Sequence, residues 1–182
     1  MIFNIIVAHT FNKNGIGFKN TLPWRLKKEL ENFKKITTKV IEDPVVNYIN
    51  TVVMGKKTWD SIPESNKPLK NRLNIIITNQ TIKSQNKFVV YCNWTDLLKT
   101  IISFNNNLIT GDNKKIYQIY QNYIIGGESI YKLALNKLNI NKIYTTEIYK
   151  KVECDKFFPS LKDNTDFVLT ECSDFINENN IY

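Results

Sequence analysis

The stretch that decides the fold class is "YIIGGESIYKLALNKL", residues 123–138. Its first five residues are an apolar run that ends at two glycines, and residues 128–138 carry apolar side chains at helical spacing. The run predicts a buried strand, and the segment after it predicts an amphipathic helix. A strand that passes through glycine directly into a helix is typical of α/β folds with a mainly parallel sheet.

The same alternation of strand and helix extends along the rest of the chain. Further strands are predicted at 2–9, 50–55, 73–78, 87–91 and 142–150, and further helices at 24–38, 56–62 and 94–104. Residues 105–115 are polar and predict a surface loop, whereas 166–175 predict a late antiparallel strand. We therefore expect one α/β domain over residues 1–182, with a mainly parallel central sheet flanked by helices and antiparallel strand structure toward the C-terminal end.

The composition places the chain among soluble globular proteins. Hydrophobic residues make up 42% and charged residues 23% of 182 residues, and no apolar run approaches the roughly 20 residues that a membrane span needs. Cys92, Cys154 and Cys172 are odd in number and widely spaced, so neither a disulfide framework nor a metal site is predicted. With His9 as the single histidine, zinc catalysis is not expected either. A reducing, cytoplasmic compartment is the simplest expectation.

The formal net charge of +8 allows two kinds of partner. One is a nucleic acid, and the other is an anionic small substrate or cofactor. The lysines are scattered rather than clustered, and the aromatic residues show no repeated exposed pattern. Nucleic acid is therefore the less favoured partner, and much of the charge is explained by a solvated lysine-rich surface.

Two glycine-containing turns are candidate phosphate sites. "MGKKTW" (54–59) and "IIGGES" (124–129) each run from a predicted strand through glycine to the start of a helix, where free backbone N–H groups attract anions. Each alone is as consistent with an ordinary capped helix. Two such turns at one sheet edge suit a diphosphate-containing dinucleotide, although the longer GxGxxG fingerprint of a conventional Rossmann site is missing.

The predicted helix in "TLPWRLKKELENF" (21–33) carries a carboxylate on its apolar face. Leu26, Leu30, Phe33 and Ile36 form one stripe at helical spacing, and Glu29 lies within that stripe rather than on the polar side. The glycine-containing loop 14–24 before the helix is long enough to cover a pocket. Arg72, just before a predicted strand, is suited to hold a carboxylate in bidentate fashion or to be a plain surface residue.

Taken in order, these motifs resemble the dihydrofolate reductase family. The resemblance rests on "IVA", "GIGFKNTLPW", Glu29, "MGKKTWDSIP", "PLKNRLNIIIT", "IIGGESIY" and "YTTEI…ECDKFFP", and it covers nearly the whole chain. It implies reduction of 7,8-dihydrofolate to 5,6,7,8-tetrahydrofolate with NADPH, a reaction of one-carbon metabolism that supports nucleotide biosynthesis and is a target of antifolates. Hydride would pass to pterin C6. Glu29, matching the family's active-site carboxylate, would accept two hydrogen bonds from the pterin edge and assist protonation of N5 through an ordered water.

The resemblance also implies the site residues. The catalytic set is Glu29, Trp24, Leu22 and Thr146. The substrate-binding set is Ile6, Val7, Ala8, Glu29, Leu30, Phe33, Ser61, Ile62, Leu69, Arg72, Ile125, Tyr131 and Thr146. The cofactor-binding set is Ala8, Ile16, Gly17, Lys56, Lys57, Thr58, Ile77, Thr78, Asn79, Asn93, Ile125, Gly126, Gly127, Glu128, Ser129 and Ile130. Gly126 and Gly127 match a pair that the family joins by a cis peptide, and the loop around 15–22 matches a cover over the pocket.

The sequence departs from the family pattern in two places. Asn79 and Asn93 stand where relatives often have arginines that grip the cofactor's 2′-phosphate, which leaves Lys56 and Thr78 as candidate contacts. We still expect NADPH, with weaker discrimination against NADH. The chain also stops at "FINENNIY", before the family's final antiparallel strand. Two alternatives are open: the chain is short by nature, or it is part of a longer polypeptide, for which we hypothesise a fused thymidylate synthase domain after it.

Two other functions are compatible with parts of the sequence. The pyrimidine reductase of riboflavin synthesis shares the fold and the glycine-pair cofactor site, and a basic nucleic-acid-binding protein without catalysis would explain the charge. Glu29, the "LPW" segment and Arg72 serve a pterin and a glutamate tail, so they favour the folate enzyme. His9 is assigned a packing role, because it has no histidine or cysteine partner nearby.

Overall fold

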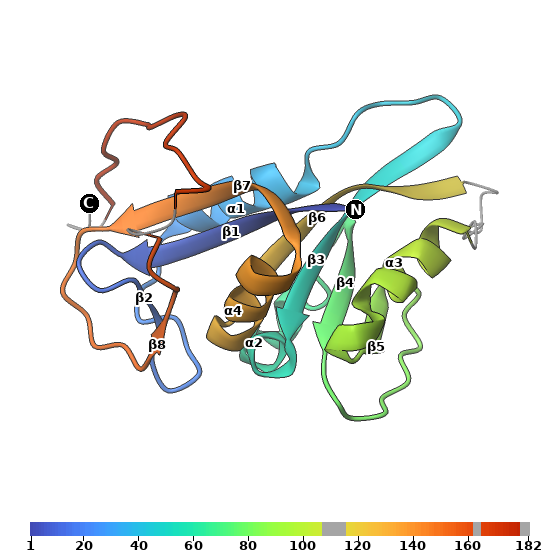
Figure 1. Cartoon of the computed structure of the whole chain (residues 1–182), viewed down its shortest axis with the longest axis horizontal. Coiled ribbons are helices and arrows are strands. Elements are labelled where there is room, and N and C mark those ends of the chain that lie inside the picture. Colours follow the sequence, from blue (N-terminus) through green and yellow to red (C-terminus); the bar gives the residue numbers. More distant parts are fainter. Residues whose placement is uncertain (107–115, 162–164, 179–182) are drawn as a thin grey trace.

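Six strands form one parallel sheet. The computed structural model describes residues 1–106, 116–161 and 165–178, and within these the strand order is β5-β4-β3-β6-β1-β7 (Figure 1). The strands are β1 (Ile2–Thr10), β3 (Val46–Gly55), β4 (Arg72–Ile77), β5 (Val89–Cys92), β6 (Ile116–Gly126) and β7 (Asn139–Ile148). Every pair of neighbours in this sheet is parallel, so the predicted fold class is confirmed.

Helices cover both faces of the sheet. The four α-helices are α1 (Lys27–Thr38), α2 (Lys56–Ser61), α3 (Leu97–Asn106) and α4 (Glu128–Lys137), with short 3₁₀ turns at η1 (Glu64–Asn66) and η2 (Trp94–Asp96). Figure 1 shows α4 in front of the strands and α1 behind them. Because successive strand side chains point to opposite faces, Val53 packs with α3 and α4 whereas Val52 and Met54 pack toward α1 and α2.

A second, two-stranded sheet is antiparallel. It pairs β2 (Gly15–Gly17) with β8 (Lys156–Phe157), so antiparallel pairing toward the C-terminal end is present in a different segment from the one predicted. The strand predicted at 166–175 is wrong, since no strand forms there. Most of the apolar side chains in this segment are exposed, with Val168 at 80% and Leu169 at 85%, although the Phe175 ring packs edge-on against Tyr149.

Helix α1 begins later and is less buried than predicted. Leu26 is its N-cap in extended conformation, and the helix starts at Lys27 rather than at residue 24. Its last turn is tied to the sheet by hydrogen bonds, because Asn50 Nδ2 donates to the carbonyls of Thr37 (3.0 Å) and Lys39 (2.9 Å). The N-cap Leu26 packs with Ile148 of β7, whereas Leu30, predicted to be buried, is 48% exposed. Most of the predicted loop 105–115 lies outside the described residues.

Candidate active site

The carboxyl ends of the six parallel strands meet at one edge of the sheet. The register aligns Met54 of β3 with Gly126 of β6 on one side and Ile76 of β4 on the other, and it aligns Ala8 of β1 with Thr146 of β7. The predicted phosphate turns, the end of the first strand and Thr146 are therefore brought to the same edge. This edge is where open parallel sheets bind ligands.

The middle of this edge is a backbone cradle formed by glycines. The Gly126–Gly127 peptide bond is cis, and Gly126 has φ +114°, a conformation that favours glycine. A Cβ atom on Gly127 would lie 3.1 Å from Thr58 Oγ1, and one on Gly55 would lie 3.2 Å from Ile130 Cγ1. The beginnings of α2 and α4 are thus packed side by side at the cradle, and the free backbone N–H groups of α4 provide anion donors.

Glu29 of α1 has the electrostatics of a proton-exchanging carboxylate. Burial is the main cause that raises its pKa to about 7, and the nearby negative charge of Glu178 raises it further. The charge of Glu29 in turn contributes to a raised pKa of the buried Tyr131 phenol, after burial itself. Tyr131 Oη donates to the carbonyl of Ile6 at 2.9 Å. The Glu29 carboxylate therefore lies close enough to Tyr131, whose hydroxyl is bonded to β1, for the two groups to interact electrostatically.

Glu178 holds the start of α1. Its two carboxylate oxygens accept hydrogen bonds from the backbone N–H groups of Lys27 (2.6 Å) and Lys28 (2.9 Å). Leu26, the N-cap residue, provides no side-chain hydrogen bond, so the carboxylate takes over that role. Sequence reasoning missed Glu178, because it lies about 150 positions from the helix that it caps.

The residues that flank Glu29 in the sequence include exposed apolar side chains and a buried donor that lacks a partner. Leu22 is 55% exposed and Leu30 is 48% exposed. Trp24 is buried, and within the described residues its indole Nε1 has no hydrogen-bond partner. A buried unpaired N–H calls for an ordered water or a ligand atom. The half-buried Thr146 lies beside Ala8 in the same register.

Arg72 at the start of β4 is a buried cation without an acidic partner. It is 5% exposed, and burial lowers its pKa to about 10. Nη1 donates to Thr37 Oγ1 at 2.8 Å, Nε donates to the carbonyl of Lys70 at 3.0 Å, and the guanidinium lies 5.7 Å from the centre of the Phe33 ring. No salt bridge to Arg72 is present within the described residues. An unpaired buried guanidinium is costly unless an anion binds, so this position favours an anionic ligand group.

The remaining predicted substrate contacts divide between the two faces of the sheet. Ile62 and Leu69 pack with Phe33 and Ile6 on the face that carries Glu29. The side chain of Val7 packs on the opposite face with α4, so its contribution to a site is limited to its backbone. Ser61 is exposed and donates to the carbonyl of Thr58 at 2.7 Å.

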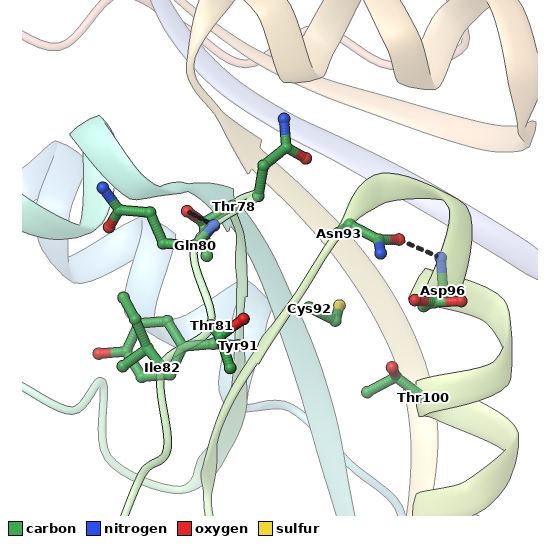
Figure 2. A pocket seen from close by; sticks show the side chains of 10 residues that line it. Thr78, Gln80, Thr81, Ile82, Tyr91, Cys92, Asn93, Asp96 and Thr100 are labelled. Atoms are coloured by element: carbon green, nitrogen blue, oxygen red, sulfur yellow. Dashed lines mark hydrogen bonds between the residues drawn. The ribbon is translucent and has the colours of Figure 1, made fainter.

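A cavity of about 380 Å³ lies beyond the ends of β4 and β5. Thr78, Asn79 and Asn93, all predicted cofactor contacts, line it together with Asp96, which the sequence reasoning missed (Figure 2). Lys56, another predicted cofactor contact, forms an ion pair with Asp60. Its ammonium group donates to both carboxylate oxygens, at 2.6 and 2.7 Å. This pair was not predicted, although its i,i+4 spacing is visible in the sequence.

The loop before α1 is tied to the segment that contains β8. Asp155 N donates to Gly17 O at 2.9 Å, and Asp155 Oδ2 accepts from Lys19 N at 3.3 Å. Beyond Gly17 the chain makes a tight hairpin turn, in which Lys19 and Asn20 both have positive φ and Phe18 and Thr21 exchange backbone hydrogen bonds.

The described residues contain neither a metal-binding cluster nor a membrane-spanning helix. No group of histidine, cysteine, aspartate and glutamate side chains there has an arrangement that could hold a metal ion. None of the helices in that part of the chain has the length and apolar character needed to cross a membrane.

Comparison with known proteins gives consistent matches. A family model described as dihydrofolate reductase matches residues 2–182. The chain is 36% identical over 172 residues to the dihydrofolate reductase of Heliothis virescens, covering 91% of this chain and 83% of that protein. It is 39% identical over 163 residues to the dihydrofolate reductase of Schistosoma mansoni, covering 88% of this chain and 80% of that protein. It is also 33% identical to the bifunctional dihydrofolate reductase-thymidylate synthase of Daucus carota, covering 89% of this chain but 29% of that protein.

Proposed function

The chain belongs to the dihydrofolate reductase family and has its oxidoreductase role in folate and one-carbon metabolism, and from this premise we propose how its own residues carry out the reaction. The reaction of the family is the reduction of dihydrofolate to tetrahydrofolate. We propose NADPH as the hydride donor and Glu29 as the residue that both holds the pterin and assists its protonation. The observation that supports this most strongly is the half-buried Glu29 carboxylate, with its pKa raised to about 7, beside exposed apolar side chains.

Glu29 and Arg72 bind the two polar ends of the substrate. The Glu29 carboxylate accepts hydrogen bonds from the 2-amino group and the adjacent ring N–H of the pterin, a bidentate pair that fixes the ring plane. The Arg72 guanidinium binds the α-carboxylate of the glutamate tail and so gains the anionic partner that it lacks among the described residues. The apolar surfaces of Leu22, Leu30 and Phe33 cover the heterocycle between them. Antifolates that present the same two donors compete for Glu29.

Proton delivery uses the raised pKa of Glu29. A carboxyl group with a pKa of about 7 exchanges a proton readily near neutral pH. We propose that the unpaired Trp24 Nε1 and the Thr146 hydroxyl hold the water that carries this proton to pterin N5. Burial of the site keeps that transfer from competing with bulk water.

The glycine cradle fits the diphosphate of a dinucleotide. Side chains at Gly126 and Gly127 would fill the space against Tyr131 and Thr58, so only bare backbone leaves room for a ligand there. When bound, the nicotinamide supplies the hydride that adds to pterin C6. Lys57, Thr58 and the first N–H groups of α4 hold the phosphates, and Ala8, Ile16 and Leu22 border the nicotinamide. Thr78 and Lys56 are the proposed 2′-phosphate contacts, and the loop at 15–22 covers the ring.

An assay of NADPH oxidation with dihydrofolate tests the proposal. Glu29→Gln keeps the shape of the side chain but removes its charge, and Glu31→Gln, on an exposed position of the same helix, is the matched control. We expect Glu29→Gln to lose about 100-fold or more of the turnover at pH 7, with part of the loss recovered at acid pH, where substrate arrives protonated. Undiminished turnover in Glu29→Gln contradicts the role given to this residue.

A fused thymidylate synthase domain is a separate proposal. It is supported by the bifunctional relatives, which include those of Daucus carota and Glycine max. Sequencing the transcript past the codon for Tyr182 tests it, and a stop codon directly after that position rules it out. We also propose a cytoplasmic location, because Cys92, Cys154 and Cys172 are all free thiols.

A further inference from the structure

The cavity beyond β4 and β5 lies at the position expected for the adenosine half of a bound dinucleotide. With the diphosphate at the Gly126–Gly127 cradle and the nicotinamide toward Ala8 of β1, the other half extends along the edge toward the ends of β3, β4 and β5. We call this cavity the ribose pocket; its lining is Thr78–Ile82, Tyr91–Asn93, Asp96 and Thr100. We infer that the ribose pocket does not select for a 2′-phosphate, so that NADH serves as hydride donor within about tenfold of NADPH. This inference rests on the proposed function.

The lining of the ribose pocket has the wrong charge for a phosphate. Figure 2 shows hydroxyl, amide and carboxylate groups around the cavity, and no lysine or arginine lines it in the part of the chain that the structure describes. Asp96 is the ionised group in this lining, and its carboxylate repels a phosphate dianion. A carboxylate accepts a hydrogen bond from a ribose 2′-hydroxyl, whereas recognition of a 2′-phosphate requires a cation.

Asn93 and Thr78 are also committed to local contacts. Asn93 Oδ1 accepts hydrogen bonds from Asp96 N (2.9 Å) and Thr95 Oγ1 (2.7 Å), so this side chain caps the η2 turn and holds Asp96 in place. Thr78 Oγ1 accepts from Gln80 N at 3.2 Å, which leaves its own proton for a ligand oxygen. The two side chains therefore shape a neutral polar pocket beside a fixed carboxylate.

The nearest cations are directed elsewhere. Lys56, the proposed 2′-phosphate contact on α2, is neutralised by the bidentate contact with Asp60. Lys83 and Lys87 line a different hollow, of about 400 Å³, that shares only Ile82 and Tyr91 with the ribose pocket. A 2′-phosphate that binds Lys56 therefore competes with Asp60 for the same ammonium group. The 2′-phosphate of NADPH therefore adds little to the free energy of binding relative to NADH.

The experiment compares two nucleotides that differ only in the 2′-phosphate. Adenosine 5′-monophosphate and adenosine 2′,5′-bisphosphate are titrated into the intact protein by calorimetry, and kcat/KM is measured with NADH and NADPH. For the wild type we expect the two dissociation constants, and the two values of kcat/KM, to lie within about tenfold of each other.

Two variants of the ribose pocket and one control locate the effect. Asn79→Arg places a cation at an exposed position of the lining, and Asp96→Asn removes its carboxylate while keeping the shape. Asn139→Arg adds the same charge as Asn79→Arg at the amino end of β7, on the opposite edge of the sheet. We expect Asn79→Arg to tighten the bisphosphate about tenfold or more and to leave the monophosphate unchanged. We expect Asp96→Asn to tighten the bisphosphate severalfold and to weaken the monophosphate, whose 2′-hydroxyl loses its charged acceptor. Asn139→Arg is expected to affect neither nucleotide.

The outcomes separate this inference from the proposed function. A wild type that binds the bisphosphate about 100-fold more tightly than the monophosphate, with a matching NADPH preference, overturns the inference but leaves the reductase proposal intact. Failure of both dinucleotides to reduce dihydrofolate overturns the proposed function, and the calorimetric ratio still decides what the ribose pocket selects. Equal tightening by Asn79→Arg and Asn139→Arg assigns the effect to net charge and also contradicts the inference.

Discussion

Thr37 orients the guanidinium of Arg72. The Thr37 hydroxyl donates its single proton to the carbonyl of Phe33 at 2.7 Å, which leaves its oxygen to accept from Arg72 Nη1 at 2.8 Å. Thr37 is fully buried, so water cannot replace this contact. The last turn of α1 and the first residue of β4 are therefore linked, and the cation proposed to bind the glutamate tail is held in one orientation by a residue that does not itself bind the tail.

Loss of this acceptor tests the role of Arg72. We expect Thr37→Val to raise KM for dihydrofolate about tenfold, because a hydrogen bond to a charged group is lost and the guanidinium loses its fixed orientation. Binding of a pterin that lacks the glutamate tail stays unchanged. Thr38→Val is the control, since Thr38 makes the same kind of bond to a helix carbonyl (Lys34 O, 2.7 Å) without touching Arg72. Equal weakening of both ligands assigns Thr37 to helix packing alone.

Glu29 makes the stability of the protein depend on pH. Its folded pKa of about 7 lies above the ordinary glutamate value of 4.5, so the folded state binds more protons than the unfolded state between these pH values. Stability therefore falls as pH rises from about 4.5 through about 7 and levels off above. The total loss is roughly 2–3 kcal/mol after allowance for solvent screening. Denaturant unfolding of wild type and Glu29→Gln across this range measures it.

The Glu29→Gln variant is expected to lack the part of the pH dependence of stability that Glu29 contributes. We expect Glu29→Gln to be more stable than wild type at pH 8, whereas Glu31→Gln keeps the wild-type slope, because Glu31 is exposed on the same helix. If the free energy of unfolding depends on pH in the same way for wild type and Glu29→Gln, the Glu29 carboxylate is not shielded from water.

The cap formed by Glu178 couples the C-terminal segment to Glu29. We expect Glu178→Gln to lower the pKa of Glu29, because a repelling charge is removed, and to lower stability by about 1 kcal/mol, because one capping oxygen and its interaction with the helix dipole are lost. Nuclear magnetic resonance titration of the Glu29 carboxyl carbon measures the pKa. Glu171→Gln, exposed on the same segment, is the control. An unshifted Glu29 titration in Glu178→Gln shows that the two carboxylates do not interact.

Gly126 is predicted to tolerate no side chain. Gly126→Ala introduces a Cβ at φ +114° and 3.1 Å from the Tyr131 hydroxyl oxygen. We therefore expect the free energy of unfolding to fall by roughly 2–4 kcal/mol. Gly17→Ala is the matched control, because its Cβ would lie at ordinary contact distances from the Thr21 carbonyl oxygen (3.4 Å) and Lys156 Cβ (3.8 Å). Thermal unfolding of both variants checks the difference, and equal melting temperatures contradict it.

Sequence patterns predicted the parallel sheet but not how firmly each element is packed. The strand run 73–78 was recognisable because parallel strands are apolar on both faces, and it matches β4 within one residue at each end. The run 123–127 identified only the buried end of β6, which begins at Ile116, because the first part of that strand is more polar and less buried. The exposure of Leu30 was not predictable, because helical periodicity identifies a face without saying which part of it reaches the sheet. The strand predicted at 166–175 failed because strand propensity alone supplies no pairing partner.

In the candidate site, too, some residues were predictable from the sequence and others were not. Glu29 was recognisable from its place among apolar residues, and the resemblance predicted the positions of Arg72 and the glycine pair. Thr37, Asp96 and Glu178 were not predictable, because each acts through a contact that only the folded chain creates. Local spacing reveals helix neighbours such as Lys56 and Asp60, whereas long-range hydrogen bonds leave no such signal.

The attachment of β2 to β8 has a kinetic consequence. Gly17 and Lys19 are bonded to Asp155, so movement of the turn at 18–21 strains hydrogen bonds to a residue 136 positions from Lys19 in the sequence. On the proposal that this turn covers the bound nicotinamide, the residence time of the ligand depends in part on the region that follows β7. We expect substitutions near residue 155 to change the rate of ligand dissociation.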